Sequence, residues 1–366
     1  MPTANILDTR TVTTTDHYHG WPTVARLRDG RLMAVCSGGR DLHVCPFGQV
    51  RLIESDDDGE TWSDERILAD GPLDDRDSGI VQTPSGVLCV FWFTSYLIDH
   101  YRKTLAAATA PDGEHWMDAA RQARWRDRLA QLDAMTESQI KAELGCWMIR
   151  SDDGGRTWSA RSRVPVNAPH GAVVLDDGRL FYAGREVFQG SERCAVVTSA
   201  DDGRTWSDLT ILPVGDGHDA AQYHELHAVH ADNGDIIVQI RNHNEDCKFE
   251  TLQLESTDGG ASWTRPHSIG VWGYPSHLMK LRDGRLLMTY GYRNKPIGNQ
   301  ARLSSDHGRS WSEPMWVSRD ASNWDLGYPS SVELGDGSIL SLWYECINEQ
   351  APPDVVLRIA RWRIED

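Results

Sequence analysis

Short apolar runs separated by tight polar turns recur along the whole chain. In each repeat an apolar run reaches an Asp-Gly, Asn-Gly or Ser-Gly turn, and a second apolar run follows. Such a turn between alternating apolar runs is the strongest short-range signal for a β-hairpin. The turns lie at residues 26–33 (RLRDGRLM), 83–88 (TPSGVL), 175–180 (LDDGRL), 231–236 (ADNGDI), 281–286 (LRDGRL) and 334–339 (LGDGSI). The pattern therefore predicts six hairpins.

A second repeat interlocks with the hairpins. Residues 151–158 (SDDGGRTW) follow the pattern Ser-x-Asp-x-Gly-x-(Thr/Ser)-Trp, which returns at 55–62, 199–206, 256–263 and 304–311. Ser and Asp side chains can bond backbone N–H groups in a turn, Gly supplies a positive φ, and Trp is a large apolar anchor. Near-identical copies at this regular spacing indicate a repeat architecture rather than separate sites.

Calcium binding is the competing interpretation of the first copy, because Asp56, Asp58 and Glu60 alternate as EF-hand ligands do. That loop requires Gly at its sixth position, where this chain has Thr61. We therefore predict no metal at these turns and interpret them as hairpin fasteners.

The repeated octapeptide resembles the Asp box of the sialidase superfamily. The resemblance implies an all-β fold, a six-bladed β-propeller formed by residues 1–366 as one domain, with the boxes far from the active site. The sixth hairpin is followed by no box, so its blade lacks an outer strand that Ile6–Thr14 can supply. Such a closure removes the sheet edges that invite aggregation.

One segment breaks the pattern within the second blade. Residues 112–145 carry apolar side chains at three- and four-residue intervals, and Thr136-Glu-Ser-Gln139 resembles a capping box. We predict a helical insertion there. Hairpin alternation places it on the face opposite the turns, where it is a wall or lid of the active site, a subunit contact, or a decoration without function.

Charge and composition limit the kinds of molecule that this chain is expected to bind. The 366 residues carry a formal net charge of −17, which argues against nucleic acid and anionic membranes as partners. Seven cysteines without C-x-x-C spacing indicate reduced thiols, and neither a metal nor a cofactor is predicted. Without a signal-like N-terminus or a long apolar run, the chain is expected to be cytoplasmic, or secreted or periplasmic if a signal has been removed.

The strand ends opposite the turns should meet at one rim. Counting outward from the turns places two sets of polar residues there. The entering strands contribute His19, Asp77, His170, His224, Glu225, Tyr274 and Tyr328, and the leaving strands contribute Arg40, Arg185, Arg241, Arg293 and Glu345. A single arginine is more often a structural ion pair, but four together in an acidic protein indicate recognition of an anion such as a carboxylate.

The resemblance extends to some of these positions. In sialidases a Glu precedes the fourth-blade turn and an Arg follows it, which matches Glu225 and Arg241; the family's later Tyr and Glu resemble Tyr328 and Glu345. Asp77 matches the second-blade Asp. The family's third arginine has an approximate counterpart in Arg293 or Arg302, and its first-blade acid in Asp41.

The first-blade arginine motif of the family, F-R-I-P, is His19-Gly20-Trp21-Pro22 in this chain. The arginine is absent, so the resemblance supports the predicted fold more strongly than it supports the substrate of the family.

Three functions follow as hypotheses. The first is an exo-acting glycoside hydrolase for an acidic oligosaccharide or glycoconjugate, with Tyr328 as nucleophile, Glu225 as its base and Asp41 as acid/base. The second is a polysaccharide lyase in which His170, His224 or Tyr274 abstracts a proton beside a uronic acid carboxylate. The third is a glycan-binding propeller without catalysis. A homo-oligomer is left open.

Overall fold

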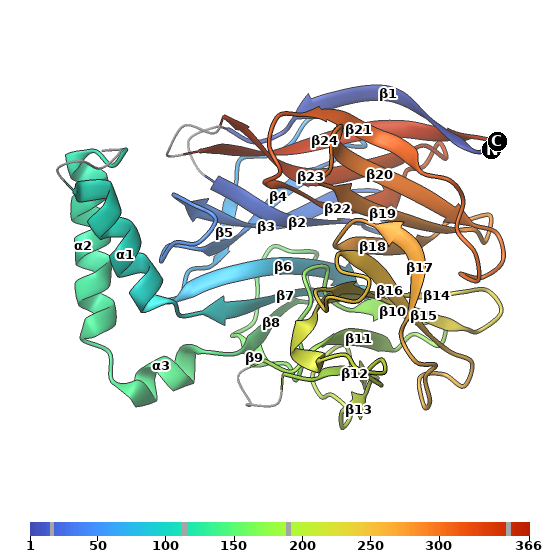
Figure 1. Ribbon diagram of the computed structural model, residues 1–366, viewed down its shortest axis with the longest axis horizontal. Helices are drawn as coiled ribbons and strands as arrows, with labels where there is room; N and C mark the ends of the chain where they lie inside the picture. The colour runs from blue at the N-terminus through green and yellow to red at the C-terminus, as the bar shows by residue number, and fades with distance from the viewer. Residues whose placement is uncertain (15–17, 111–115, 188–191, 349–352) are drawn as a thin grey trace.

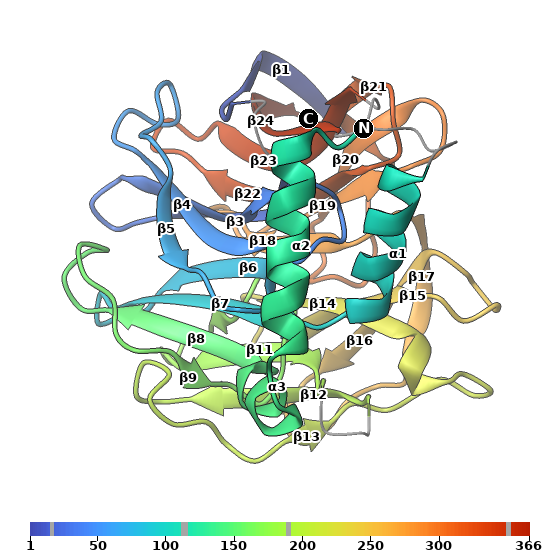
Figure 2. The same ribbon diagram turned by 90° about the vertical axis from the view of Figure 1, so that its left-hand side faces the viewer.

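The computed structural model describes residues 1–14, 18–110, 116–187, 192–348 and 353–366. The chain forms β-sheets arranged around a central axis, with three helices gathered at one face (Figures 1 and 2). The all-β propeller arrangement predicted from the two repeats is therefore confirmed. None of the helices in the described part of the chain is long and apolar enough to span a membrane.

Four blades are separate sheets of four consecutive antiparallel strands. In chain order the strands are β6 (Asp74–Gln82), β7 (Leu88–Ser95), β8 (Cys146–Ser151) and β9 (Ser162–Arg163); β10 (Val173–Val174), β11 (Leu180–Arg185), β12 (Cys194–Ser199) and β13 (Thr210–Ile211); β14 (Tyr223–His230), β15 (Ile236–Asn242), β16 (Glu250–Ser256) and β17 (His267–Trp272); and β18 (Ser276–Lys280), β19 (Leu286–Tyr292), β20 (Ile297–Ser304) and β21 (Met315–Ala321). A short 3₁₀ helix, η1 (Ala220–Gln222), leads into β14.

The other eight strands form one sheet rather than two. They are β1 (Thr3–Thr11), β2 (Tyr18–Arg26), β3 (Leu32–Arg40), β4 (Gln49–Ser55), β5 (Arg66–Ala69), β22 (Leu326–Glu333), β23 (Ile339–Asn348) and β24 (Asp354–Glu365). The prediction of six separate blades is therefore wrong. Among the described residues, four blades are separate four-stranded sheets, and the remaining eight strands form a single sheet. The cause is a parallel pairing of β2 with β24 at Tyr18 and Val355, which joins the first strands of the chain to the last.

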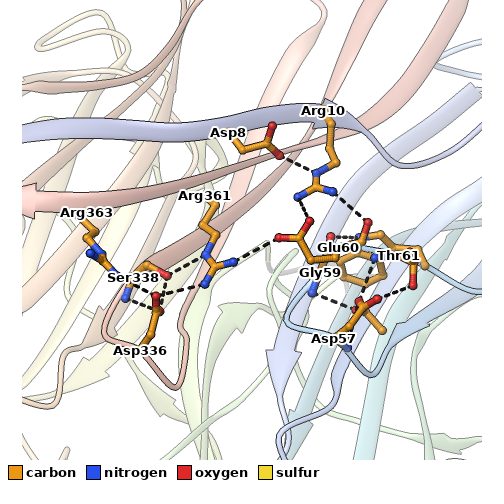
Figure 3. A network of polar contacts seen from close by, with 12 residues as sticks. Asp8, Arg10, Asp57, Gly59, Glu60, Thr61, Asp336, Ser338, Arg361 and Arg363 are labelled. Carbon is orange, nitrogen blue, oxygen red and sulfur yellow. Dashed lines mark hydrogen bonds and ion pairs between the residues drawn. The ribbon is translucent and has the colours of Figure 1, made fainter.

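The two ends of the chain are fastened together. Strand β1 pairs antiparallel with β24 from Thr3 opposite Glu365 to Thr11 opposite Arg358. Figure 3 shows side chains that extend this pairing: Arg10 of β1 and Arg361 of β24 both bind Glu60 of the first box, at 2.8 and 3.2 Å. Strand β1 therefore covers the outer side of β24, and the ion pairs attach both strands to the first box.

Each box is a self-contained turn. In the first, Ser55 Oγ accepts a hydrogen bond from Gly59 N at 2.9 Å, and Asp57 accepts from the backbone and hydroxyl of Thr61 at 2.9 and 2.6 Å. Gly59 has a φ of 86°, which explains its place in the repeat. The other four boxes repeat the Ser and Asp bonds. The Asp side chains are occupied by their own turns, which suits the fastener interpretation.

The helical segment between β7 and β8 is longer than predicted. It contains α1 (Ile98–Thr109), α2 (Ala119–Asp133) and α3 (Glu137–Glu143), so helix begins before residue 112; residues 111–115 lie outside the described part of the chain. The predicted capping box of α3 is present, with both reciprocal bonds between Thr136 and Gln139. Trp125, Leu129 and Leu132 of α2 pack with Tyr101 of α1 and Phe47 in one apolar cluster. This cluster attaches the helices to the propeller face seen in Figure 2.

Candidate active site

Four inner strands each hold one non-glycine residue in a strained conformation. Trp21, Asp77, Glu225 and Tyr328 have φ angles of 52°, 51°, 31° and 52°. Each lies where the register of its strand shifts against the next: in β2, β6, β14 and β22. Bulges re-aim side chains, and strain of this kind clusters at functional sites. The four residues thus mark a candidate site on the face where the inner strands begin.

Tyr328 and Glu225 form a close pair. The Tyr328 hydroxyl donates a short hydrogen bond to Glu225 Oε1. Arg241 Nη1 donates to both carboxylate oxygens of Glu225, at 2.9 and 2.7 Å, and lies 3.3 Å from the Tyr328 oxygen. The residues come from β22, β14 and β15, so the fold unites positions that are far apart in sequence. A hydroxyl bonded to an oriented carboxylate is the arrangement of a nucleophile and its base.

The electrostatics of the pair are consistent with these roles. Burial would raise the pKa of Glu225, but Arg241 and the Tyr328 hydroxyl outweigh burial and hold that pKa below its usual value. Burial and the neighbouring charge of Glu225 raise the pKa of Tyr328 well above 10. The resting pair is therefore a neutral phenol and a carboxylate, and the phenol can attack only if Glu225 accepts its proton.

A second carboxyl group near the pair has a shifted pKa. Burial raises the pKa of Asp77 to about 7, with Arg76 opposing the shift and Glu225 adding to it. A carboxyl group that is half protonated near neutral pH can both give and take a proton, which is what a general acid/base requires.

Guanidinium groups line one side of the cluster. Arg241 and Arg293 lie over the same ring, with their Cζ atoms 4.2 and 5.0 Å from the centroid of Tyr274. Arg293 donates to Leu326 O at 3.0 Å and makes no ion pair within the described residues. Arg185 donates to His224 Nδ1 at 2.9 Å. Two stacked arginines, of which one lacks a carboxylate partner, favour an anionic ligand.

Two histidines accompany these arginines and are neutral. His224 and His243 lie 4.6 Å apart between ring centroids. Burial and Arg185 lower the pKa of His224 to about 4, and burial and Arg241 lower the pKa of His243 to about 4. Arg241 Nε donates to His243 Nε2 at 2.8 Å. Each ring thus accepts a hydrogen bond from one arginine.

Five sequence-predicted site residues lie elsewhere or are already occupied. Arg40 is buried in an ion pair with Asp74 and also bonds four backbone or hydroxyl oxygens. Its guanidinium is saturated, so Arg40 is a structural residue. Asp41 is also structural: it accepts from Trp125 Nε1 at 2.7 Å and from Arg121 and Arg124 of α2 at 3.2 and 3.3 Å.

The other three predicted site residues are also bonded or packed within the fold. His19 is buried between Glu65, at 2.5 Å, and Val355 O. Glu345 is buried against Arg358, at 2.8 Å, and Trp343 Nε1. His170 packs at the axis with two other histidines rather than among the arginines. Counting along strands finds the right ends but cannot show which side chains are already paired.

The structure adds Trp21 and its neighbours to the residues of the candidate site. The Trp21 ring lies 6.4 Å from that of Tyr328 and 5.0 Å from that of His43. Arg76 stacks on Trp21 with its Cζ 4.2 Å from the ring centroid. His43 contacts Asp325 Oδ1 at 3.0 Å. The one sequence signal for this group was the segment 19–22, where the expected arginine is missing.

Within the described part of the chain, no group of three or more His, Cys, Asp or Glu side chains is arranged to hold a metal ion.

The chain matches one protein-family model and several solved structures. The family model described as BNR repeat-like domain matches residues 130–340, more than half of the chain. No curated protein matches the sequence. A protein of unknown function from Dyadobacter fermentans is similar in structure, with a TM-score of 0.76, 19% identity, and 99% of this chain and 100% of that one covered.

Two enzymes of known type are also similar. The NanB sialidase of Streptococcus pneumoniae has a TM-score of 0.66 at 14% identity, with 99% of this chain and 70% of that one covered. The intramolecular trans-sialidase of Ruminococcus gnavus has a TM-score of 0.63 at 13% identity, with 95% and 94% covered. At these identities the likeness establishes the fold.

Proposed function

This chain belongs to the BNR repeat-like domain family of the sialidase superfamily, and from that premise we propose that it is an exo-acting glycoside hydrolase for a terminal acidic sugar. The observation that carries the proposal is the Tyr328–Glu225–Arg241 arrangement, in which a phenol donates to a carboxylate that an arginine keeps ionised. A neutral nucleophile suits an anionic sugar, because a carboxylate nucleophile would be repelled by the charge of the substrate.

The reaction would proceed in two displacements. Tyr328 Oη attacks the anomeric carbon while its proton passes to Glu225, and the glycosidic bond breaks as the leaving oxygen takes a proton from Asp77. Water then attacks the anomeric carbon, gives one proton to Asp77 and releases the tyrosine oxygen, which recovers its proton from Glu225. Both protons return to their starting groups, so the cycle balances.

Asp77 takes the acid/base role first considered for Asp41. Its pKa of about 7 supports this assignment, whereas the Asp41 carboxylate is held by Trp125 and two arginines of α2. An acid that is partly protonated at neutral pH combines the correct protonation state with enough driving force for proton transfer.

Arginines would bind the carboxylate of the sugar. Arg241 and Arg293 flank Tyr274, and the chain lacks an arginine at residue 20. Arg76 lies over Trp21, beside the segment where that arginine is missing, and so offers a third guanidinium from a different strand. We therefore expect the carboxylate of the substrate to lie closer to Arg76 than it would in a sialidase that has all three family arginines.

The architecture supports a single site on one face. We take the eight-stranded sheet as two functional blades, β2–β5 and β22–β24 with β1, which gives six inner strands around the axis. The helices α1 and α2 stand on the face where these strands begin and would wall the substrate site (Figure 2). Arg124 of α2 also donates to Gly39 O at 3.1 Å, so the helix orders the end of β3.

The lyase hypothesis has less support, since each of its histidine bases is occupied or distant. His224 uses Nδ1 to accept from Arg185, and His170 lies in the axial histidine cluster. Product analysis after incubation with sialosides and uronic-acid polysaccharides tests the proposal. A hydrolase releases a new reducing sugar, and a lyase releases an unsaturated sugar that absorbs in the ultraviolet; the absence of any product would leave a glycan-binding protein and contradict the proposal.

A further inference from the structure

A polar cavity lies between the inner strands, away from the candidate active site. It has a volume of about 450 Å³ and is bounded by the later residues of the inner strands. On β2 the cavity residues Thr23 and Arg26 follow Trp21, and on β22 Ser331 and Glu333 follow Tyr328. The cavity therefore belongs to the end of the strands that carries the hairpin turns, opposite the arginine-lined rim.

Three histidines form its inner wall. His170, His227 and His277 are almost fully buried, and their ring centroids lie 4.6 to 5.3 Å apart. Burial lowers the pKa of each, in the case of His277 to about 3. The three imidazole rings are therefore uncharged at neutral pH.

The backbone decides which nitrogen of each ring carries the proton. His227 Nδ1 accepts from Leu278 N at 2.9 Å, and His277 Nδ1 accepts from Ser331 N at 3.4 Å. A neutral ring whose Nδ1 accepts must carry its proton on Nε2. Both rings therefore have Nε2–H donors, which cannot ligate a cation without losing a proton.

Two groups bordering the cavity lack partners. His170 Nε2 is buried and makes no hydrogen bond to any residue that the structure describes, although Nδ1 of the same ring lies 3.1 Å from Thr23 Oγ1. The Arg26 guanidinium makes no ion pair or hydrogen bond within the described residues, and its Nε is buried. By contrast, Lys280 and Arg282 at the same cavity are paired with Asp232 and Glu333. A partly buried guanidinium without a carboxylate is costly unless a ligand pairs with it.

We propose that this cavity binds a small oxyanion, of the phosphate or sulfate class, between Arg26 and the histidine wall. Arg26 supplies the charge, and the ring N–H groups of His227 and His277 supply neutral donors. The site would be independent of glycoside hydrolysis, because it shares no residue with the Tyr328 cluster. Its location on the turn face leaves it open while a glycan occupies the opposite face.

Isothermal titration calorimetry with inorganic phosphate at constant ionic strength and pH 7.5 tests the site. We expect saturable binding at one site per chain and an affinity at least tenfold weaker in Arg26→Gln. Arg309→Gln is the matched control, because this exposed arginine lies on a box turn outside the cavity. Glucose 6-phosphate is a second probe: tighter binding than inorganic phosphate would assign the site to an organic phosphate, and equal or weaker binding to the free ion.

Three results would overturn the proposal. One is the absence of saturable phosphate binding to the wild-type protein. Another is binding that survives Arg26→Gln but is lost in Arg293→Gln, since the anion would then occupy the rim on the other face. The third is tight binding of Zn²⁺ without phosphate binding, which would show that the histidines ligate a cation. Circular dichroism melting checks that Arg26→Gln is folded, as expected for an unpaired side chain.

Discussion

Asp41 is either the acid/base of the reaction, as the sequence suggested, or a structural residue that attaches helix α2 to the propeller. Its carboxylate is almost fully buried and accepts from Trp125 Nε1, which is itself fully buried, and from two arginines whose side chains are 25% and 45% exposed. In Asp41→Ala the indole N–H loses its partner, which costs about 1–3 kcal/mol, and each partly exposed arginine pair adds about 0–1 kcal/mol. We expect a total loss of about 1–5 kcal/mol.

The assay combines thermal unfolding with turnover of the substrate found by product analysis. At about 2 cal/mol/K of unfolding entropy per residue, that loss lowers the melting temperature of this 366-residue chain by about 1–7 °C. Asp41→Asn keeps one oxygen to accept from Trp125, so its shift should be roughly half as large. Turnover per folded molecule should stay within a few-fold of wild type in both variants. If instead Asp41→Asn melts normally and turnover falls by about a hundredfold or more, Asp41 is the acid/base and our reasoning is refuted.

Asp77→Asn should lower kcat by about a hundredfold or more, and the wild-type rate should fall as pH rises through about 7, because a general acid must be protonated; an unchanged alkaline limb in the variant would contradict the role. The depressed pKa values of His170, His227 and His277 mean that the unfolded chain binds more protons below pH ~6.5, so stability in urea should fall as pH drops from 6.5 toward 4; a flat profile would show that these rings are not buried neutral. Asp258→Ala removes the side-chain bonds to Ser256 and Ser262, so it should lower the melting temperature and leave kcat unchanged, whereas lost activity with normal melting would move the box into the active site.

Much of the architecture could be predicted from the sequence because its signals are local. An Asp-Gly turn and a Ser-x-Asp-x-Gly box each determine their own hydrogen bonds, as Ser55, Asp57 and Gly59 do, so the hairpins could be counted in advance. The joining of β2 to β24 could not, because it depends on one long-range bridge between Tyr18 and Val355. A bridge of this kind leaves no periodic trace in the sequence.

The candidate site was predictable only in part for the same reason. Glu225, Arg241 and Tyr328 were selected by strand position and resemblance, and the structure brings them into contact. Arg40 and Asp41 satisfied the same positional rule, yet long-range partners occupy them: Asp74 and the helix α2. Strand counting identifies an end of a blade, whereas the availability of a side chain depends on tertiary partners.

We propose Tyr328 as the nucleophile and Glu225 as its base, and turnover by Tyr328→Phe tests both roles. The change keeps the ring and removes only the oxygen that contacts Glu225 and Arg241. Tyr290→Phe is the control, because that hydroxyl bonds Gln300 at 2.8 Å and is no part of the cluster.

We predict a loss of about a thousandfold or more in kcat for Tyr328→Phe, with a melting temperature near wild type and with Tyr290→Phe within a few-fold of wild-type turnover. Glu225→Gln should lose a comparable amount, and the double variant should be little worse than either single one, since the two groups act as a unit. If Tyr328→Phe retains more than about a tenth of wild-type turnover, a barrier change of less than about 1.4 kcal/mol, Tyr328 is not the nucleophile.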